Sequence, residues 1–394
     1  MNRLVLIGNG FDLAHGLRTQ YQDFIDWYWW KRIKELMLLQ SDLSQDQLCT
    51  LKLRSGKSWT VFLLYQPELR QMKGLEITKF FKENPEEFEV SSSPFFDRIS
   101  KSIETKGWVD IENEYYELLK KFALKEPSSE ELNDLNCQLQ YVQDLLAEYL
   151  KLISQKGIEP IEKIRSEIYS PIKYNDISNE SHTIFEEYIE GCYKKGALFW
   201  NEKLSRYKLS ELYLPDNIYD DNYPDLFMLP DNILFLNFNY TNTADAYLRK
   251  DVSHQIHIHG HLSDSESIIF GYGDEMDSNY SQLQGLNDNT CLQNIKSIKY
   301  LESDNYRNVL RFIESAPFQV CIMGHSCGNS DRTLLNTLFE HKNCISIKPY
   351  FYKRDDGSDN YLDIVQNISR NFTDMKLMRD RVVNKTYCEP LCDK

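Results

Sequence analysis

Arg3-Leu4-Val5-Leu6-Ile7-Gly8-Asn9-Gly10, near the start of the chain, is the stretch that decides the fold. A short apolar run stops at a pair of glycines, and this pattern predicts a buried strand followed by a tight turn. Glycines in such a turn let backbone N–H groups approach a phosphate closely, because no Cβ stands in between. The stretch raises the hypothesis of an α/β fold with a nucleotide site after its first strand.

The dinucleotide fingerprint of hydride-transferring enzymes needs a third glycine three residues after the second, and an acidic residue about 20 positions on. Leu13 stands at the place of that third glycine. The nearest acids at a suitable distance, Asp26 and Asp42, follow no second strand, because residues 21–39 have helical spacing. The sequence therefore disfavours a dehydrogenase. An ordinary strand-to-helix turn also explains the two glycines, so residues further along must decide.

The composition is that of a folded, acidic protein. The chain has 394 residues, and a hydrophobic content of 41% with 13% aromatic residues excludes a disordered chain. A net charge of −15 disfavours nonspecific binding to nucleic acids and to anionic membranes. Nine scattered cysteines fit reduced thiols better than a disulfide framework. Because no signal peptide or stretch of about 20 apolar residues is found, we expect a cytoplasmic protein without membrane partners.

Strand patterns lie at the two ends of the chain. Beyond the first strand they are predicted at residues 232–238, 255–258, 267–270, 318–323 and 344–351. Helical stretches alternate with them at residues 241–249, 294–313 and 333–340. This alternation predicts an α/β, Rossmann-like, mostly parallel sheet covered by helices.

The segment between these parts is polar and has a helical period. We therefore expect residues 1–40 to hold the first strand, glycine turn and first helix of a nucleotide-binding core. Residues 41–230 would form a large all-helical insertion, and residues 231–394 would complete the core. The insertion would serve as a lid over the site, as an oligomerisation surface, as a surface for a defence-system partner, or as a sensor for a phage component.

Side chains suited to chemistry follow four of the predicted strands. They are Asn239, His259, the Gly271-Tyr272-Gly273 turn, and the Gly324-His325-Ser326 loop with Asp331. Carboxyl ends of parallel strands meet at one edge of a sheet, where ligands of such sheets bind. We therefore expect the opening turn to face the Asn239 amide and the His259 imidazole across one crevice.

Several motifs, in order, resemble the bacterial AbiH-type abortive-infection proteins. They are Gly8 to Leu17 (GNGFDLAHGL), Trp108 to Glu112 (WVDIE), Asn237 to Thr241 (NFNYT), Ile258-His259-Gly260, and Met323 to Ser326 with Asp331. This resemblance implies a bacterial anti-phage effector.

More remotely, the same order of motifs resembles the sirtuin-like domains of anti-phage proteins. That resemblance implies NAD as substrate or ligand, with Asn239 and His259 matching the Asn and the His that act at the nicotinamide ribose. The residues matching the dinucleotide site are Gly8, Asn9, Gly10, Asp12, Gly324, Ser326 and Asp331.

Two departures from the sirtuin pattern bear on the reaction. Sirtuin deacylases hold a structural zinc with two Cys pairs, and this sequence has no Cys-x-x-Cys pair, so no metal is expected. The resemblance then implies NAD hydrolysis with release of nicotinamide rather than lysine deacylation. Thr241 stands where that pattern has an acidic residue.

The chemistry of that reaction suits these residue types. Cleavage passes through an oxocarbenium-like state, so the site must hold the ribose and offer a base near neutral pH. Histidine has a suitable pKa. The neutral amide of Asn239 can accept from a water and donate to the ribose without adding charge beside a developing cation.

Each of these residues also has a plain structural interpretation. Asn239, Asp12 and Asp331 suit helix caps, and His259 and His257 suit the end of a strand. His15 is favoured as a structural group. Asp110 and Glu112 fit a solvated first helical turn, where acidic side chains suit the helix dipole.

Two other classes of function stay open. His257, His259 and His261 alternate along a strand and its exit, a spacing found in metal-dependent hydrolases or nucleases, and Asp264 and Glu266 are near. The third class is a non-catalytic nucleotide sensor.

Overall fold

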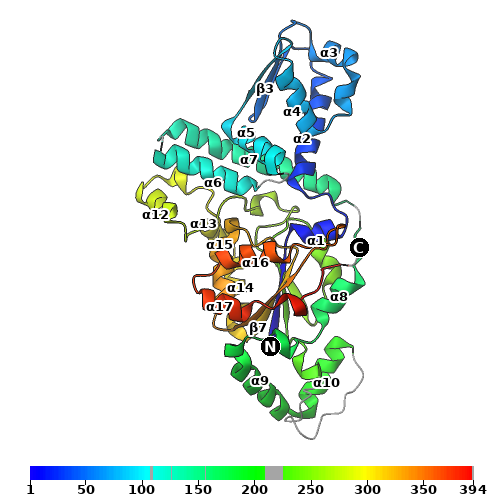
Figure 1. Ribbon diagram of the computed structural model, residues 1–394, viewed down its shortest axis with the longest axis vertical. Coiled ribbons are helices and arrows are strands. Elements are labelled where there is room, and N and C mark those ends of the chain that lie inside the picture. Colours follow the sequence, from blue (N-terminus) through cyan, green and yellow to red (C-terminus); the bar gives the residue numbers. More distant parts are fainter. Residues whose placement is uncertain (107–109, 126, 156, 209–224, 393–394) are drawn as a thin grey trace.

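The computed structural model describes residues 1–106, 110–125, 127–155, 157–208 and 225–392. A five-stranded sheet forms its centre (Figure 1), and all four neighbouring pairs of strands are parallel. Its strands are β1 (Asn2–Ile7), β5 (Ile233–Asn237), β6 (Ser253–His257), β7 (Phe318–Met323) and β8 (Cys344–Tyr350). The predicted Rossmann-like parallel sheet is confirmed.

The strand order is β6-β5-β1-β7-β8. From β1 the chain builds outward through β5 and β6, then crosses to the other side of β1 and adds β7 and β8. This is the doubly wound order of nucleotide-binding sheets, and the direction of winding reverses between β1 and β7.

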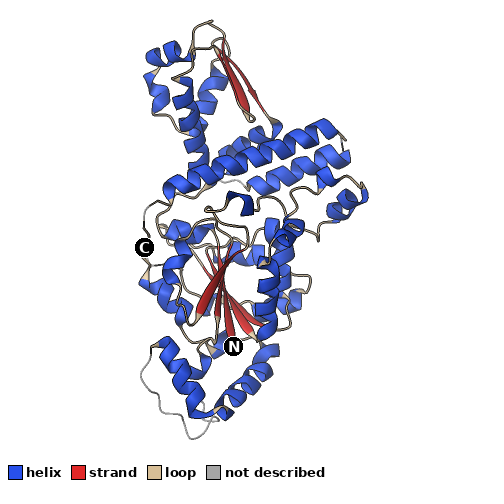
Figure 2. Ribbon diagram, turned by 180° about the vertical axis from the view of Figure 1, so that it is seen from behind, coloured by secondary structure: helices blue, strands red, loops and turns tan. Residues whose placement is uncertain are grey.

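Successive side chains of each strand point to opposite faces of the sheet, and helices pack against both faces. Leu4 and Leu6 of β1 belong to one buried cluster, and Val5 and Ile7 belong to another on the opposite face. Such two-sided burial explains why parallel strands are continuous apolar runs in the sequence. Figure 2 shows the helices flanking the strands. The first face is covered by α14 (Asn305–Ser315), α15 (Arg332–Phe339), α16 (Tyr361–Arg370) and α17 (Met375–Arg381). The second face packs against α8 (Glu162–Tyr169). Helices α9 (His182–Lys194), α10 (Gly196–Tyr207) and α11 (Asp225–Met228) belong to the same buried cluster, and Figure 1 shows α9 and α10 beyond the amino ends of the strands.

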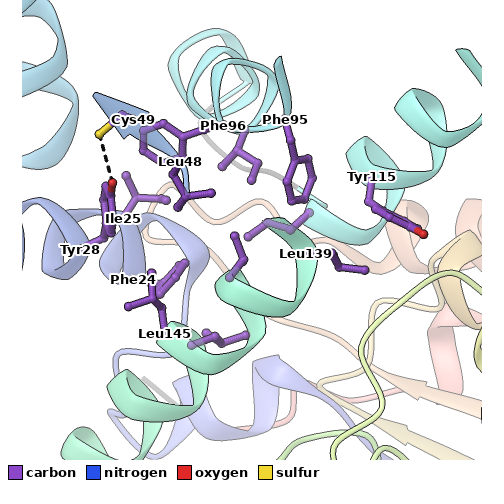
Figure 3. Close-up of a cluster of buried hydrophobic side chains, with 14 of the residues drawn as sticks. Phe24, Ile25, Tyr28, Leu48, Cys49, Phe95, Phe96, Tyr115, Leu139 and Leu145 are labelled. Carbon is purple, nitrogen blue, oxygen red and sulfur yellow. Dashed lines mark hydrogen bonds between the residues drawn. The ribbon is translucent and has the colours of Figure 1, made fainter. Parts of the chain in front are cut away.

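The insertion forms a second body above the carboxyl ends of the strands (Figure 1). Its helices are α2 (Tyr21–Leu36), α3 (Trp59–Tyr65), α4 (Gly74–Glu83), α5 (Pro94–Lys106), α6 (Ile111–Lys120) and α7 (Ser129–Ile153). They share a separate buried cluster, in which Phe24 and Tyr28 of α2 meet Phe96 and Leu139 from α5 and α7 (Figure 3).

The expectation of an all-helical insertion was wrong. A three-stranded antiparallel sheet of β2 (Leu43–Gln45), β3 (Cys49–Leu53) and β4 (Phe88–Ser92) lies within it. In β3 the side chains of Cys49, Leu51 and Leu53 are buried, whereas Lys52 faces outward. Strands of three to five residues with one buried face are too short for their alternation to stand out in a polar segment.

The structure also divides the chain differently from the expected boundaries at residues 40 and 230. Helix α2 packs into the buried cluster of the insertion. Helix α8, expected in the insertion, packs on the core sheet through Ile164 and Ile168. Arg3 of β1 donates to the carbonyl oxygens of Glu167, Ile168 and Ser170 at 2.7 to 3.0 Å, which ties the end of α8 to the first strand.

Three predicted core elements differ in the structure. Residues 267–270 are not a strand, because Ile268 and Phe270 enter the cluster of the insertion while Ile269 enters that of the core. The helix expected at 241–249 is reduced to a 3₁₀ turn, Thr243–Tyr247. The helix expected at 294–313 is divided into α13 (Lys296–Lys299), a 3₁₀ turn and α14.

The remaining helices are the short α1 (Asn9–Ala14) and α12 (Ser278–Gly285). Across the described ranges, no helix combines the length and apolar character needed to cross a bilayer.

Candidate functional site at the carboxyl ends of the strands

The glycine turn joins β1 to the end of β7. A Cβ on Gly10 would lie 2.9 Å from the Cα of Gly324, and one on Gly324 would lie 2.0 Å from the nitrogen of Phe11. The N–H of Gly10 donates to the carbonyl of Gly324, and the N–H of Phe11 donates to that of Gly8, both at 2.8 Å. The glycines are therefore needed for close backbone packing at the switch point. Because the amides of Gly8, Gly10 and Phe11 already have carbonyl partners, they are not free to hold a phosphate.

Asn239, which follows β5, packs against this glycine turn. Its side-chain nitrogen donates to the carbonyl oxygen of Gly8 at 2.9 Å, and its backbone N–H donates to the side chain of Asn237. The interpretation of Asn239 as a helix cap was wrong, since the next helical turn has Asn242 at its N-cap.

Asp12 faces the same strand end from α1. One carboxylate oxygen accepts a hydrogen bond from Thr241 at 2.7 Å, and the other is buried with no hydrogen-bond partner among the described residues. Burial raises the pKa of Asp12. Asp12 lies in the first turn of α1 and is not its N-cap, which is Gly8.

His259 points into the protein and joins a buried charged cluster. Its Nε2 lies 3.2 Å from Oδ1 of Asp331, and its side chain is only 6% exposed. The ammonium of Lys296 lies 2.8 Å from the same oxygen of Asp331 and 2.8 Å from Oε2 of Glu112. Asp331 does not cap α15 with its side chain, contrary to one interpretation of the sequence.

The charges of this cluster depend on one another. Burial lowers the pKa of Lys296, but the carboxylates of Asp331 and Glu112 outweigh it and raise the pKa above its usual value. Burial opposes ionisation of Asp331, yet Lys296 and His259 hold its pKa well below the usual range. Burial and the charge of Lys296 lower the pKa of His259, so this imidazole is neutral at neutral pH and can accept a proton.

Aromatic rings and a second histidine enclose His259. The hydroxyl of Tyr300 lies 3.2 Å from Nε2 of His259, and the ring of Phe238 contacts both His259 and His325. Nδ1 of His325 accepts from the N–H of Cys327 at 3.0 Å. Its Nε2 therefore carries the proton in the neutral ring, and it faces Asp331 at 3.6 Å.

The sequence did not reveal Lys296, Tyr300 or His325 as members of the site. Lys296 and Tyr300 lie within the stretch predicted as one helix, residues 294–313, where nothing distinguishes them from other helical residues. His325 was named only as part of the Gly324-His325-Ser326 motif. The expected solvated position of Glu112 was wrong, since this side chain is buried.

The other predicted residues have varied surroundings. Ser326 and Asn9 are exposed at the rim, where the Asn9 side chain accepts from Thr19. His15 bonds to the carbonyl of Phe11 and to the hydroxyl of Tyr247, contacts that agree with its structural interpretation. Asp110 caps α6 by accepting from the N–H of residue 113 at 3.0 Å. Trp108 and Val109 of the WVDIE motif lie outside the described residues.

The three alternating histidines do not converge. The strand ends at His257, and Gly260 with φ of +83° turns the chain. His257 and His261 face each other with ring centroids 4.7 Å apart, while His259 points to Asp331. Within the described part of the chain, no group of three or more His, Cys, Asp or Glu side chains has an arrangement suited to a metal ion.

Comparison with known proteins tests the resemblance seen in the sequence. The family model described as bacteriophage abortive infection AbiH matches residues 4–352, a range that includes the whole sheet apart from the first residues of β1, the insertion and every residue of the site. A search of curated proteins finds no match. The chain therefore belongs to the bacteriophage abortive infection family AbiH, which assigns it a function in the abortive response to phage.

Proposed function

We propose that this AbiH protein is an effector that binds NAD or a related nucleotide at the carboxyl edge of its sheet and hydrolyses the bond between nicotinamide and ribose. The observation that carries the proposal is the meeting of Asn239, the glycine turn and the loop after β7 at the switch point between β1 and β7. Doubly wound sheets bind nucleotides at that place.

The side chains at this edge suit the binding of a ribose. One carboxylate oxygen of Asp12 has no hydrogen-bond partner among the described residues, but Asp12 is buried, so it accepts from a ribose hydroxyl only if neighbouring segments shift. Asn239, after the end of β5, contacts the same turn. Ser326 and Asn9 are exposed and can reach the phosphates. The paired amides of the glycine turn do not contribute to this binding in the described conformation.

His259 suits the role of a base. With its Nε2–H directed at Asp331, the neutral ring keeps a lone pair on Nδ1, which is the atom that would accept a proton from the attacking water. Asp331 orients the ring, and Lys296 keeps Asp331 ionised.

The burial of the cluster favours a second candidate, a nucleotide sensor without turnover. His259 and Asp331 are 4% and 8% exposed, so a bound nucleotide reaches them only if neighbouring segments shift. A protein that stayed in this arrangement would bind a nucleotide at the rim and leave it intact.

Purified protein incubated with NAD, with free nicotinamide followed over time, tests the proposal. We expect Asn239→Ala and His259→Ala to abolish both nicotinamide release and toxicity in bacteria while the proteins remain folded. His261→Ala is the matched control, because this histidine lies two residues away and bonds to Ser263 near the surface. Parent-like toxicity and NAD loss in both variants would show that the assigned roles are wrong.

The same preparation separates the other classes of function. Loss of activity on adding a chelator would indicate a metal-dependent hydrolase. A nucleotide that raises the melting temperature without being consumed would indicate the sensor.

A further inference from the structure

His257, the last residue of β6, supports the loop that carries Asn239. β6 is an edge strand of the parallel sheet, and its residue His257 pairs with Asn237 of β5. The imidazole extends beyond this pair, and its Nδ1 lies 3.1 Å from the carbonyl oxygen of Asn239. A side chain of the edge strand therefore binds the backbone of the residue that contacts the glycine turn.

The other nitrogen of this imidazole faces Gln255. Gln255 and His257 lie on one face of β6, because they are two residues apart in a strand. The side-chain nitrogen of Gln255 lies within hydrogen-bond distance of Nε2 of His257, and it also donates to Oδ1 of Asp245 at 2.9 Å. A carboxylate only accepts hydrogen bonds, so Asp245 requires the nitrogen and not the oxygen of this amide on its side. The second N–H of the amide is then directed at His257.

These contacts select one form of the imidazole. Nε2 of His257 faces an N–H of Gln255 and must accept, so the proton of the neutral ring lies on Nδ1 and is donated to the carbonyl of Asn239. Burial lowers the pKa of His257, so the ring is neutral at neutral pH. The tautomer that binds Asn239 is therefore determined by Asp245, through Gln255.

The backbone of Asn239 is held on both sides of its Cα by side chains. Residues 238–242 form neither helix nor strand, so no regular pattern of backbone hydrogen bonds fixes this loop. The N–H of Asn239 donates to the side chain of Asn237 at 2.9 Å, and its carbonyl oxygen accepts from His257. These two bonds restrict φ and ψ of Asn239, the two soft dihedrals that decide where its side chain points. The side chain points to the carbonyl oxygen of Gly8.

We propose that His257 is a positioning residue for Asn239, held in its Nδ1–H form by Asp245 through Gln255. It acts through the backbone from which the Asn239 amide reaches the glycine turn. The consequence for catalysis rests on the proposed function, whereas the consequence for the Asn239 side chain does not.

Two replacements of His257 separate its hydrogen bond from its bulk. The side-chain nitrogen of asparagine stands at the place of Nδ1, and that of glutamine stands at the place of Nε2. His257→Asn therefore keeps the donor to the carbonyl of Asn239, and His257→Gln loses it. The readout is the side-chain amide signal of Asn239 in NMR spectra of protein labelled at asparagine, identified by its absence from Asn239→Ala. We expect this signal to move in His257→Gln and to stay at the parent position in His257→Asn.

The nitrogen shifts of the His257 imidazole test the role of Asp245. They report which nitrogen carries the proton, and we expect Nδ1–H in the parent protein. Asp245→Ala frees the Gln255 amide to turn its oxygen toward the ring, so part of the population should change to Nε2–H. Asp251→Ala is the matched control, because it removes an exposed aspartate just before β6; it should leave the tautomer unchanged. A parent ring protonated on Nε2 would overturn the proposal.

Steady-state kinetics of nicotinamide release give the consequence for the proposed reaction. His257→Gln should lower kcat about 10- to 100-fold with KM nearly unchanged, because a displaced reacting group costs more in rate than in ground-state binding. His257→Asn should restore most of kcat. His261→Ala removes the ring contact with His257 and keeps the hydrogen bonds of His257, so it should resemble the parent.

This proposal and the proposed function can fail separately. A parent protein that releases no nicotinamide would reject the proposed reaction, and the two NMR readouts would still decide the role of His257. An Asn239 signal at the parent position in His257→Gln, or an equal displacement in His257→Gln and His257→Asn, would overturn the positioning role in an active or an inactive protein.

Discussion

Asn239 donates from its side-chain amide to the carbonyl oxygen of Gly8, and this bond joins residues 231 positions apart in the chain. Two residues later, the hydroxyl of Thr241 donates to Asp12 at 2.7 Å. Both bonds link the end of β5 to the turn after β1. These two strand ends form one continuous polar edge of the sheet, next to the buried cluster of His259.

Replacement of Asn239 by alanine should affect activity far more than stability. The lost hydrogen bond costs about 1 kcal/mol of folding free energy, whereas nicotinamide release should disappear. Asn305→Ala is a matched control, because the Asn305 side chain also donates to a backbone carbonyl, that of His257, at 2.9 Å. Nicotinamide assays and urea unfolding compare the two; an equal loss of activity in both would make Asn239 a structural residue only.

Lys296→Met should strongly destabilise the protein. The change leaves the buried carboxylates of Glu112 and Asp331 without their common cation, and breaking a buried pair in this way costs about 3–5 kcal/mol. Lys79→Met is the comparison, since Lys79 forms an exposed pair with Glu83, and exposed pairs contribute less than about 1 kcal/mol. Urea unfolding measures both. Similar free energies of unfolding for the two variants would contradict the importance of the buried cluster.

The stability of the protein should depend on pH through Glu112. Burial raises the pKa of this carboxyl from 4.5 to about 7, so between these values the folded state holds a proton that the unfolded chain has released. This contribution to stability is present at low pH and declines as the pH rises through that window. Asp331 has the opposite effect on stability. Because its pKa is lowered in the folded state, it stabilises the protein at neutral pH, and this stabilisation is lost on acidification.

Urea unfolding of the parent and of Glu112→Gln, at several pH values across this window, checks the assignment. In the parent, the free energy of unfolding should decline between about pH 5 and 7 because of Glu112, and this decline should be absent in the variant. The loss of stability at lower pH should remain in both proteins. Parallel curves for the two proteins would show that Glu112 does not titrate in this range.

Gly324→Ala should prevent the two strand ends from packing together. Gly324 has φ of +78°, and the added Cβ would lie 2.0 Å from the nitrogen of Phe11. Gly357→Ala is the control, because its φ of +84° is as unfavourable but the Cβ meets open space. The control should lose about 1 kcal/mol, and Gly324→Ala several times more, in melting or urea experiments. Equal losses would mean that β1 and β7 can separate without cost.

The strands of the core were predictable because burial on both faces of a parallel sheet leaves a strong signal. β1 and β7 contain the apolar runs Leu4–Ile7 and Val320–Met323, and glycines mark where they end. The positions of Asn239 and Gly8 at a common edge followed from the same reasoning, since carboxyl ends of parallel strands must meet.

The small sheet of the insertion and the cluster around Lys296 were not predictable in this way. β3 has five residues with one buried face, and such a pattern also occurs in helices and loops. Glu112 and Lys296 each resemble an ordinary charged residue at a helix start. Their burial depends on an encounter between segments 184 positions apart, and no local pattern records such an encounter.

The sequence alone determined the parallel core, the order of its motifs and the family, because local hydrophobicity and glycine turns are properties of neighbouring residues. Only the tertiary structure decided that the glycine amides are paired, that α2 belongs to the insertion, and that Lys296 links Glu112 to Asp331 and His259. These features depend on which buried groups must find partners once distant segments come together, and that requirement exists only in the folded chain.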